Sequence, residues 1–128
     1  MKLLLDTHVF LWINNDIDRL SQTIKEFCNS GAHDFYLSIA SAWEIQIKTQ
    51  LGKLSLAMPI EELVNRNIQE NSIGLLSINL SHISCLEQLP LHHKDPFDRI
   101  IIAQAIIEGM AIVSADHVFS NYTVRTIW

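Results

Sequence analysis

Four carboxylates stand where the chain passes from a short apolar run into a helical pattern. They are Asp6, Glu44, Asp98 and Asp116. The last two flank the apolar segment 100–107, which must be among the most buried parts of the protein. Carboxylate oxygens suit hard cations such as Mg²⁺ and Mn²⁺, and an ion held by them can activate water and neutralise phosphate charge. The pattern therefore indicates a divalent-metal site suited to phosphate chemistry.

Helix capping gives each of these acids an ordinary structural alternative. Asp6 and Asp116 have the positions of N-caps or first-turn acids. Two segments, Ser41–Glu44 (SAWE) and Asp95–Asp98 (DPFD), have the spacing of capping boxes, and the proline in the second favours a helix start. We therefore treat Asp95 separately, as an expected helix cap whose alternative is an outer-shell role at the metal site.

The elements predicted around the acids explain why they would meet. Short continuous apolar runs predict strands that are covered on both faces, at 2–5, 35–38, 74–78, 111–113 and, as an edge, 123–127. Helical spacing predicts helices at 7–14, 24–28, 43–51, 60–68 and, more weakly, 80–86, and a helix that is apolar all round at 96–108. This alternation predicts an α/β fold, a three-layer α/β/α sandwich with a mostly parallel sheet, in a single domain spanning 1–128.

In a parallel sheet of this kind, ligands bind beyond the carboxyl ends of the strands. All four acids are expected at that edge, close to helix N-termini. Ser, Thr or Asn would cap a helix equally well, and four neighbouring carboxylates disfavour one another's ionisation. A divalent cation removes this conflict, so a metal site explains the four acids better than capping alone.

Composition limits the other possibilities. The net charge of −5 argues mildly against binding nucleic acid through a general basic field, but a bound cation would invert the charge of an acidic site. No apolar stretch reaches the roughly 18–20 residues of a membrane span and no signal peptide is recognisable, so a cytoplasmic protein is expected. Cys28 and Cys85 are expected to be buried free thiols.

Motifs of other phosphate-handling proteins are missing. An aspartyl phosphatase would carry Asp-x-Asp after the first strand, where this chain has DTH. A phospho-receiver domain would carry an acid after the strand at 74–78, which is followed by Asn79 instead. Neither glycine-rich phosphate loop occurs, and the histidines lack zinc-site spacing.

The order and spacing of these motifs resemble those of the PIN domain, and more closely those of VapC-type toxins of bacterial toxin–antitoxin pairs. The resemblance runs from about residue 2 to residue 125 and rests on LLLDTHVFLW, LSIASAWEIQIKTQLGKL and DPFDRIIIAQAIIEGMAIVSAD with the HVF that follows. The segments 35–53 and 90–119 are specific, whereas 54–89 carries little family signal. Two departures, His8 after the first acid and Arg99 after the third, bear on substrate preference.

The resemblance implies a metal-dependent endoribonuclease. Mg²⁺ or Mn²⁺ would be held by Asp6, Asp98 and Asp116, with Glu44 binding directly or through water. Metal-bound water would then attack the phosphodiester in line and leave a 5′-phosphate and a 3′-hydroxyl. It also implies an RNA substrate, a small antitoxin partner that occludes the site, and a homodimer.

Several further residues are candidates for supporting roles. The resemblance implies that Thr7 and Ser114 orient a carboxylate or a water. Lys48, Lys53, Lys94 and Arg99 are candidate RNA-phosphate contacts. Two of them have an alternative: Lys48 has the spacing of an ion pair with Glu44, and Arg99 could pair with an acid.

The histidines and tryptophans have less specific interpretations. His8 and His117 adjoin site acids, while His92 and His93 are interpreted as surface loop residues. Trp12 and Trp43 are interpreted as core or interface residues, and the helical regions 24–28 and 60–68 as a possible dimer face.

Two alternatives to a nuclease toxin remain open at this point. The first is a PIN-like binding module with silent chemistry, and the second is an RNA-processing nuclease without an antitoxin.

Overall fold

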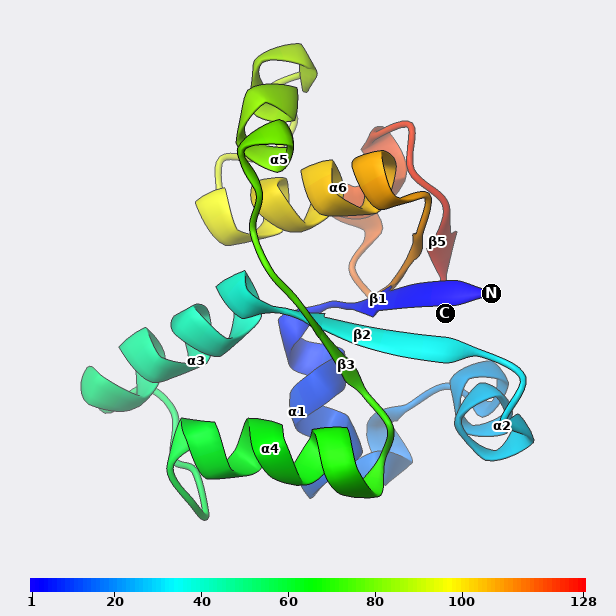
Figure 1. Ribbon diagram of the computed structural model, residues 1–128, viewed down its shortest axis with the longest axis vertical. Helices are drawn as coiled ribbons and strands as arrows, with labels where there is room; N and C mark the ends of the chain where they lie inside the picture. Colours follow the sequence, from blue (N-terminus) through cyan, green and yellow to red (C-terminus); the bar gives the residue numbers. More distant parts are fainter.

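Five short parallel strands form the centre of the protein in a computed structural model that describes residues 1–128 (Figure 1). The strands are β1 (Lys2–Leu5), β2 (Asp34–Ser38), β3 (Gly74–Leu76), β4 (Ala111–Val113) and β5 (Thr126–Ile127). Their order in the sheet is β3-β2-β1-β4-β5, and every neighbouring pair is parallel. The predicted parallel α/β sheet is confirmed, although its two outer strands are shorter than predicted.

Six α-helices and three short 3₁₀ segments connect the strands. The α-helices are α1 (Thr7–Asn15), α2 (Gln22–Ser30), α3 (Ile39–Gln50), α4 (Ile60–Glu70), α5 (Leu80–Cys85) and α6 (Pro96–Glu108). The 3₁₀ segments are η1 (Ile17–Arg19), η2 (Leu86–Gln88) and η3 (His117–Asn121). None of the helices has the length and apolar character needed to cross a membrane.

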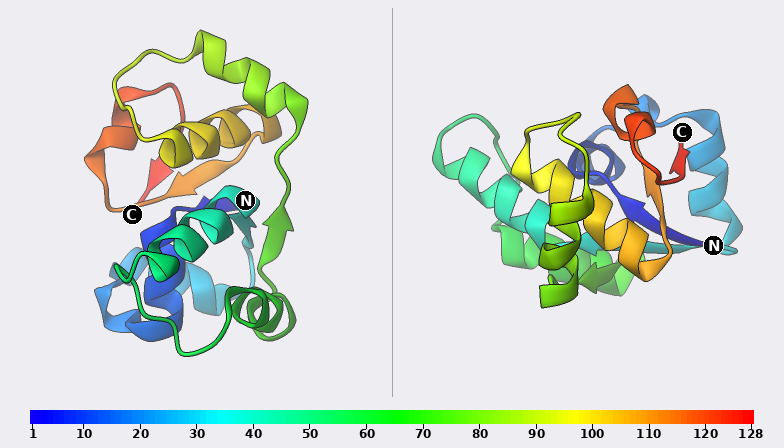
Figure 2. Two further views of the ribbon diagram at one scale, coloured as in Figure 1. Left: turned by 90° about the vertical axis from the view of Figure 1, so that its left-hand side faces the viewer. Right: turned by 90° about the horizontal axis from the view of Figure 1, so that it is seen from above.

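The sheet separates two apolar clusters, so the fold has three layers. Leu3 and Leu5 of β1 point into a cluster with residues of α1, α2, α3 and α4, whereas Leu4 points into a cluster with α6 and with Phe119. This division follows from the strand period of two, which sends successive side chains to opposite faces. Figures 1 and 2 show α1 and α4 on one side of the sheet and α5 and α6 on the other.

Helix α6 is apolar all round because it is buried on most sides. Its residues 100–105 are all buried, and it contacts α5, α3 and β4. Asp95 caps its start ahead of Pro96, and it ends at Gly109, whose φ of 68° is the left-handed conformation that glycine adopts readily. The predicted bounds, 96–108, are confirmed, and they fix the position of Asp98 in the first turn.

Three predictions about burial need correction. The two cysteines are free, as predicted, but Cys28 is exposed and Cys85 is only half-buried. Trp43 is 62% exposed, which contradicts the core role but not the interface role predicted for it, whereas Trp12 is partly buried against the core. Helix α3 turns a different face inward, on which Ser41 and Glu44 are buried beside Ala40 and Ile45. Its inner face is therefore partly polar, which apolar periodicity does not reveal.

Candidate metal site at the carboxyl edge of the sheet

The central strands β1 and β4 bring two of the predicted acids together. The chain leaves β1 at Asp6 and leaves β4 at Ser114, and the backbone N–H of Asp6 donates to the Val113 carbonyl at 3.0 Å. The strands β2 and β3 lie to one side of β1, while β4 and β5 lie to the other. The β1–β4 boundary is therefore the topological switch point of the sheet, where open α/β folds bind their ligands.

Ser114 links Asp6 to Asp116. Its hydroxyl donates to Asp6 Oδ2 at 2.5 Å and accepts the backbone N–H of Asp116 at 3.0 Å. Asp6 also caps α1, because its Oδ1 accepts the N–H of Val9 at 3.0 Å, and Asp116 caps η3 through the N–H of Val118 at 3.0 Å. Both acids thus have the capping role that the sequence offered, and the cap bonds fix their carboxylates at the sheet edge.

Glu44 reaches the same edge from α3 and is 5% exposed. Its Oε1 accepts a hydrogen bond from Thr7 at 2.8 Å, and its Oε2 lies 2.7 Å from Lys48 Nζ. The Thr7 hydroxyl also lies 2.9 Å from Ser41 Oγ. Lys48 therefore forms the i,i+4 ion pair that its spacing allowed, and this hydrogen bond raises the pKa of Lys48. A buried carboxylate with both oxygens occupied is held in one orientation.

The predicted capping box at Ser41–Glu44 is wrong. Helix α3 begins at Ile39, directly after β2, and its cap is Ser38, whose hydroxyl accepts the N–H of Ala40 at 3.0 Å. Ser41 and Glu44 are therefore already inside the helix. Glu44 consequently has no capping role, and its burial needs another explanation.

The surroundings of Asp98 disfavour the ionised form of its carboxyl group. Its pKa is raised from 3.8 to about 6, chiefly because burial disfavours the charged form; a hydrogen bond from His93, whose Nε2 lies 2.6 Å from Asp98 Oδ2, acts in the opposite direction. The negative charges of Asp95 and Glu44 contribute to the increase. Asp95 is the predicted helix cap: its Oδ1 accepts the N–H groups of Phe97 at 2.8 Å and Asp98 at 3.3 Å. The side chain of Asp98 does not complete the expected capping box, because it turns to His93.

The four predicted acids do not form a compact set of metal ligands in this structure. The only three side chains whose potential ligand atoms all lie within 4.8 Å of one another are His93, Asp95 and Asp98. Even so, the donors fit a hard divalent cation. They are oxygens, and the poorly solvated Asp98 carboxylate is disfavoured by its acidic neighbours, a conflict that a cation would relieve.

His93 is the residue that the sequence interpretation missed. The interpretation as a surface loop residue is wrong for its side chain, which is 26% exposed and bonded to Asp98. His8, His92 and His117 are exposed. The only signal in the sequence is the placement of His93 two residues before the helix cap, where a loop can fold back over the first turn of α6.

The candidate RNA contacts differ in what they bind within the protein. Lys94 is exposed and has no hydrogen-bond partner in the structure. Arg99 pairs with none of the acids; its guanidinium donates to the carbonyl oxygens of Pro90 at 2.9 Å, Leu86 at 3.3 Å and His93 at 3.5 Å. Arg99 therefore ties the loop before α6 to the helix.

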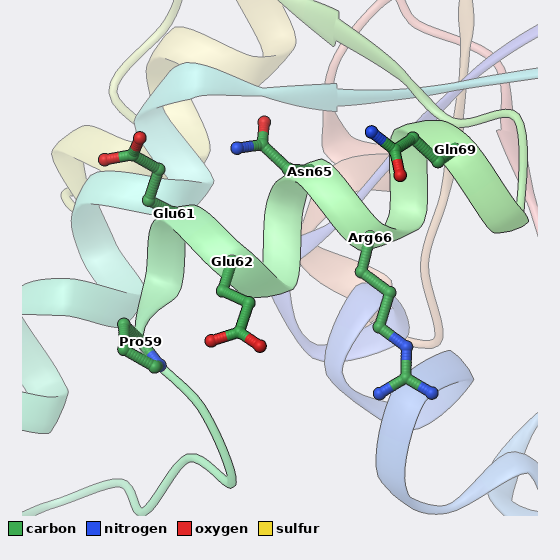
Figure 3. Close-up of a pocket in the computed structure, with 6 residues that line it drawn as sticks. All are labelled: Pro59, Glu61, Glu62, Asn65, Arg66 and Gln69. Atoms are coloured by element: carbon green, nitrogen blue, oxygen red, sulfur yellow. The ribbon is translucent and has the colours of Figure 1, made fainter.

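Two surface hollows differ in their relation to the acids. One, of about 300 Å³, adjoins Thr7 and lies between α1 and the end of α3; its lining residues are Thr7, His8, Leu11, Ile45, Lys48, Lys53 and Leu54. The other, of about 510 Å³, runs along the polar outer face of α4 between Pro59 and Gln69 (Figure 3). It contains none of the four acids, so only the first is relevant to the candidate site.

We expect the pKa of Asp98 to be visible in the pH dependence of stability. The folded-state value of about 6 exceeds the unfolded value of 3.8, so the folded chain retains this proton to higher pH. The resulting stabilisation is fully present below the unfolded pKa and is lost as the pH rises through the folded pKa. The free energy of unfolding of the metal-free wild type, measured relative to Asp98→Asn by urea titration, should therefore fall between about pH 4 and pH 7. A difference that stays constant or rises over this range would contradict the environment described for Asp98.

The sheet and its acidic edge define an α/β domain with a candidate ligand site at the carboxyl edge of its parallel sheet. Comparison with known families makes this class specific: the chain belongs to the PIN domain family, whose model matches residues 3–124. Domains of this family are typically nucleases. The predicted resemblance to the family is confirmed. No curated protein has a sequence that matches the chain.

Several solved structures share the fold at low sequence identity. VapBC2 from Rickettsia felis, bound to a DNA fragment from its promoter, has a TM-score of 0.74 and 13% identity, over 99% of this chain and 98% of that chain. DNA-bound VapBC from Salmonella typhimurium has a TM-score of 0.67 and 18% identity, over 99% and 97% of the two chains. A toxin–antitoxin complex from Klebsiella pneumoniae has a TM-score of 0.60 and 11% identity, over 98% and 96%. These likenesses establish the fold over the whole chain.

Proposed function

We propose that the protein is a divalent-metal-dependent endoribonuclease and the toxin of a bacterial toxin–antitoxin pair. The observation that carries this proposal is Asp98, a carboxylate with a raised pKa that lies near Asp95 and Glu44 in a PIN domain. Perturbed acids at such positions are typical of functional sites. The structural likeness to toxin–antitoxin complexes supports the second half of the proposal.

Four acids would hold the cation in this proposal: Asp6, Asp98, Asp116 and Glu44. A bound Mg²⁺ or Mn²⁺ would supply charge neutralisation at the scissile phosphate and an acidified water. The protein's own groups prepare the site. Ser114 holds Asp6 and the start of the Asp116 turn, and Thr7 holds Glu44. The carboxylates of Asp6 and Glu44 thus each have an outer partner that limits their rotation, as metal-ligating carboxylates generally do.

The hollow beside Thr7 supplies the features expected of an RNA path. Lys48, Lys53 and His8 line it in a chain whose net charge is −5, and three apolar side chains lie between them. Lys48 is engaged by Glu44, so Lys53 is the cation in this hollow that is free to meet a phosphate. We propose that RNA flanking the cleaved bond passes over this hollow. The exposed Lys94 would be a second RNA contact.

Replacing Lys53 should weaken RNA binding without altering the chemical step. For Lys53→Gln we expect KM for a short oligoribonucleotide to rise roughly three- to tenfold at low salt, with kcat unchanged, because one exposed phosphate contact contributes about 1 kcal/mol. Lys2→Gln, which removes the same charge at the opposite edge of the sheet, should leave KM unchanged. Equal effects of the two variants would show that net charge, not the hollow, determines binding.

Growth after induced expression tests the proposal as a whole. Wild type and Asp98→Asn are expressed in a bacterium, and total RNA is compared alongside the growth curves. Arrest and new RNA fragments in the wild type alone would support a toxin that cuts RNA through its acids. Arrest by both proteins would contradict the metal-dependent mechanism. Co-expression of a small protein encoded directly upstream should restore growth if that protein is the antitoxin.

A homodimer and a cytoplasmic location belong to the same proposal. The helical regions 24–28 and 60–68 remain the proposed dimer face. Ile68 within it is 41% exposed, whereas Ile24, Leu63 and Val64 are buried in the core and therefore unavailable to a partner.

A further inference from the structure

His93 is attached to the protein through its backbone as well as through its ring. Its N–H donates to the hydroxyl of Tyr122 at 2.9 Å, and its carbonyl lies 3.5 Å from Arg99 Nη1. Tyr122 is itself 6% exposed and belongs to the apolar cluster under α6. The ring therefore projects from a backbone that is fixed to the core and to α6, although the residue lies in a loop.

The ring makes one polar contact, and that contact is to Asp98. His93 Nε2 lies 2.6 Å from Asp98 Oδ2, and no side chain or backbone group bonds Asp98 Oδ1. A carboxylate is otherwise free to rotate about its last side-chain bond. With one oxygen bonded to a fixed ring, the other oxygen has a defined direction.

We propose that His93 is a positioning residue, which orients the carboxylate of Asp98 so that its free oxygen is available to a divalent cation. This inference rests on the proposed function, since it takes Asp98 as a metal ligand. Outer-shell partners of metal-binding carboxylates act in this way, and their loss typically lowers metal affinity 10- to 100-fold. Asp95 does not substitute for His93, because its Oδ1 is engaged by two backbone N–H groups at the start of α6.

The neighbouring His92 provides a matched control. It is exposed, and its ring packs edge-on against Tyr122, with the ring centroids 5.3 Å apart. His92→Ala therefore disturbs the same loop and the same tyrosine without touching Asp98. His93→Gln is the conservative variant, because its side-chain amide can donate a hydrogen bond toward Asp98 from nearly the same place.

Calorimetric titration of the metal-free protein with Mn²⁺, without RNA, tests the inference. We expect His93→Ala to weaken Mn²⁺ binding at least about tenfold, His93→Gln to recover most of the affinity, and His92→Ala to bind like the wild type. Thermal unfolding of each variant is measured alongside. Because metal affinity is read without RNA and is compared with a loop control, a purely structural role of the loop would affect His92→Ala and His93→Ala alike.

Three results would overturn the inference. The first is unchanged Mn²⁺ affinity in His93→Ala, and the second is an equal loss in His92→Ala. The third is direct nitrogen coordination in the wild type, detected as electron spin echo modulation from a ¹⁴N bound to Mn²⁺, which would make His93 a ligand. In all three cases the wild type still binds Mn²⁺, so the proposed nuclease stands. Failure of the wild type to bind Mn²⁺ at all would instead overturn the proposed function and this inference with it.

Discussion

Asp98→Asn should abolish RNA cleavage while leaving the fold at least as stable as in the wild type. Cleavage of an oligoribonucleotide by the purified protein is expected to fall about a thousandfold or more, because a cation at the site supplies several kcal/mol of charge stabilisation. Saturable Mn²⁺ binding should disappear with it. The substitution keeps the size of the side chain, and the amide oxygen can still accept the hydrogen bond from His93.

The expected gain in stability has the opposite sign to the usual effect of a core substitution. At neutral pH the wild type must hold an ionised carboxylate at a position that burial and two neighbouring acids disfavour, as the raised pKa shows. A neutral amide removes this unfavourable charge, so the midpoint of thermal unfolding of the metal-free protein should stay constant or rise at pH 7. Opposite changes in activity and stability are characteristic of residues that serve function at a cost to the fold.

Asp95→Asn is the matched control for this prediction. It makes the same chemical change three residues earlier, and Asn caps helices about as well as Asp. Since Asp95 serves as the cap of α6, the variant should fold normally and retain most of the cleavage activity. If Asp98→Asn cleaved RNA like the wild type, or if both variants lost activity equally, Asp98 would not be the essential ligand.

Local signals in the sequence were sufficient to predict α6 and the parallel sheet. The start of α6 is specified by Asp95 and Pro96 and its end by Gly109, so its bounds could be read without tertiary information. The outer strands were predicted too long for a physical reason. β5 pairs with β4 alone, over Thr126–Ile127; of the predicted residues before it, only Arg125 bonds to β4, where its carbonyl accepts the N–H of Ile112 at 2.8 Å. Pairing, not propensity, sets the ends of an edge strand.

The inner face of α3 could not be predicted from periodicity. Its apolar stripe, Trp43, Ile47 and Leu51, suggested the buried side, yet Trp43 and Leu51 are 62% and 63% exposed. The helix instead buries Glu44, whose partner Thr7 is 37 residues away along the chain. Burial of a polar side chain depends on partners supplied by the tertiary structure, and hydrophobic patterns contain no information about them.

The acids could be grouped because they share a topological position, whereas the partner of Asp98 could not be predicted. The carboxyl ends of parallel strands meet at one edge whatever the side chains do, so Asp6, Glu44 and Asp116 could be grouped from strand order alone. The contact between His93 and Asp98 depends on how a loop folds back, and that path is set by Tyr122 and Arg99. The sequence therefore predicts where the strands and helices of such a fold lie, but it does not predict which way a side chain in a loop, such as the ring of His93, points.

Arg99→Lys should destabilise the protein, although it keeps a positive charge at this position. The guanidinium donates to three backbone carbonyls, and this fork geometry is not available to an ammonium group. We expect the free energy of unfolding to fall by about 1–2 kcal/mol, because hydrogen bonds from a charged donor are lost at a partly buried position. Limited proteolysis should begin within the loop between α5 and α6, where these carbonyls lie.

The comparison of Arg99→Lys with Arg99→Ala separates the two roles considered for this residue. If Arg99 chiefly contacts RNA phosphates, lysine should preserve RNA affinity and its salt dependence, and alanine alone should weaken both. If it ties down the loop, both variants should lose stability and Mn²⁺ affinity, because His93 would no longer hold Asp98 in place. The observed contacts favour the second outcome: every hydrogen bond of the guanidinium is to the protein's own backbone, and one of these reaches the carbonyl of His93 itself. If the alanine variant kept its stability but bound RNA more weakly, Arg99 would instead be a residue that contacts RNA.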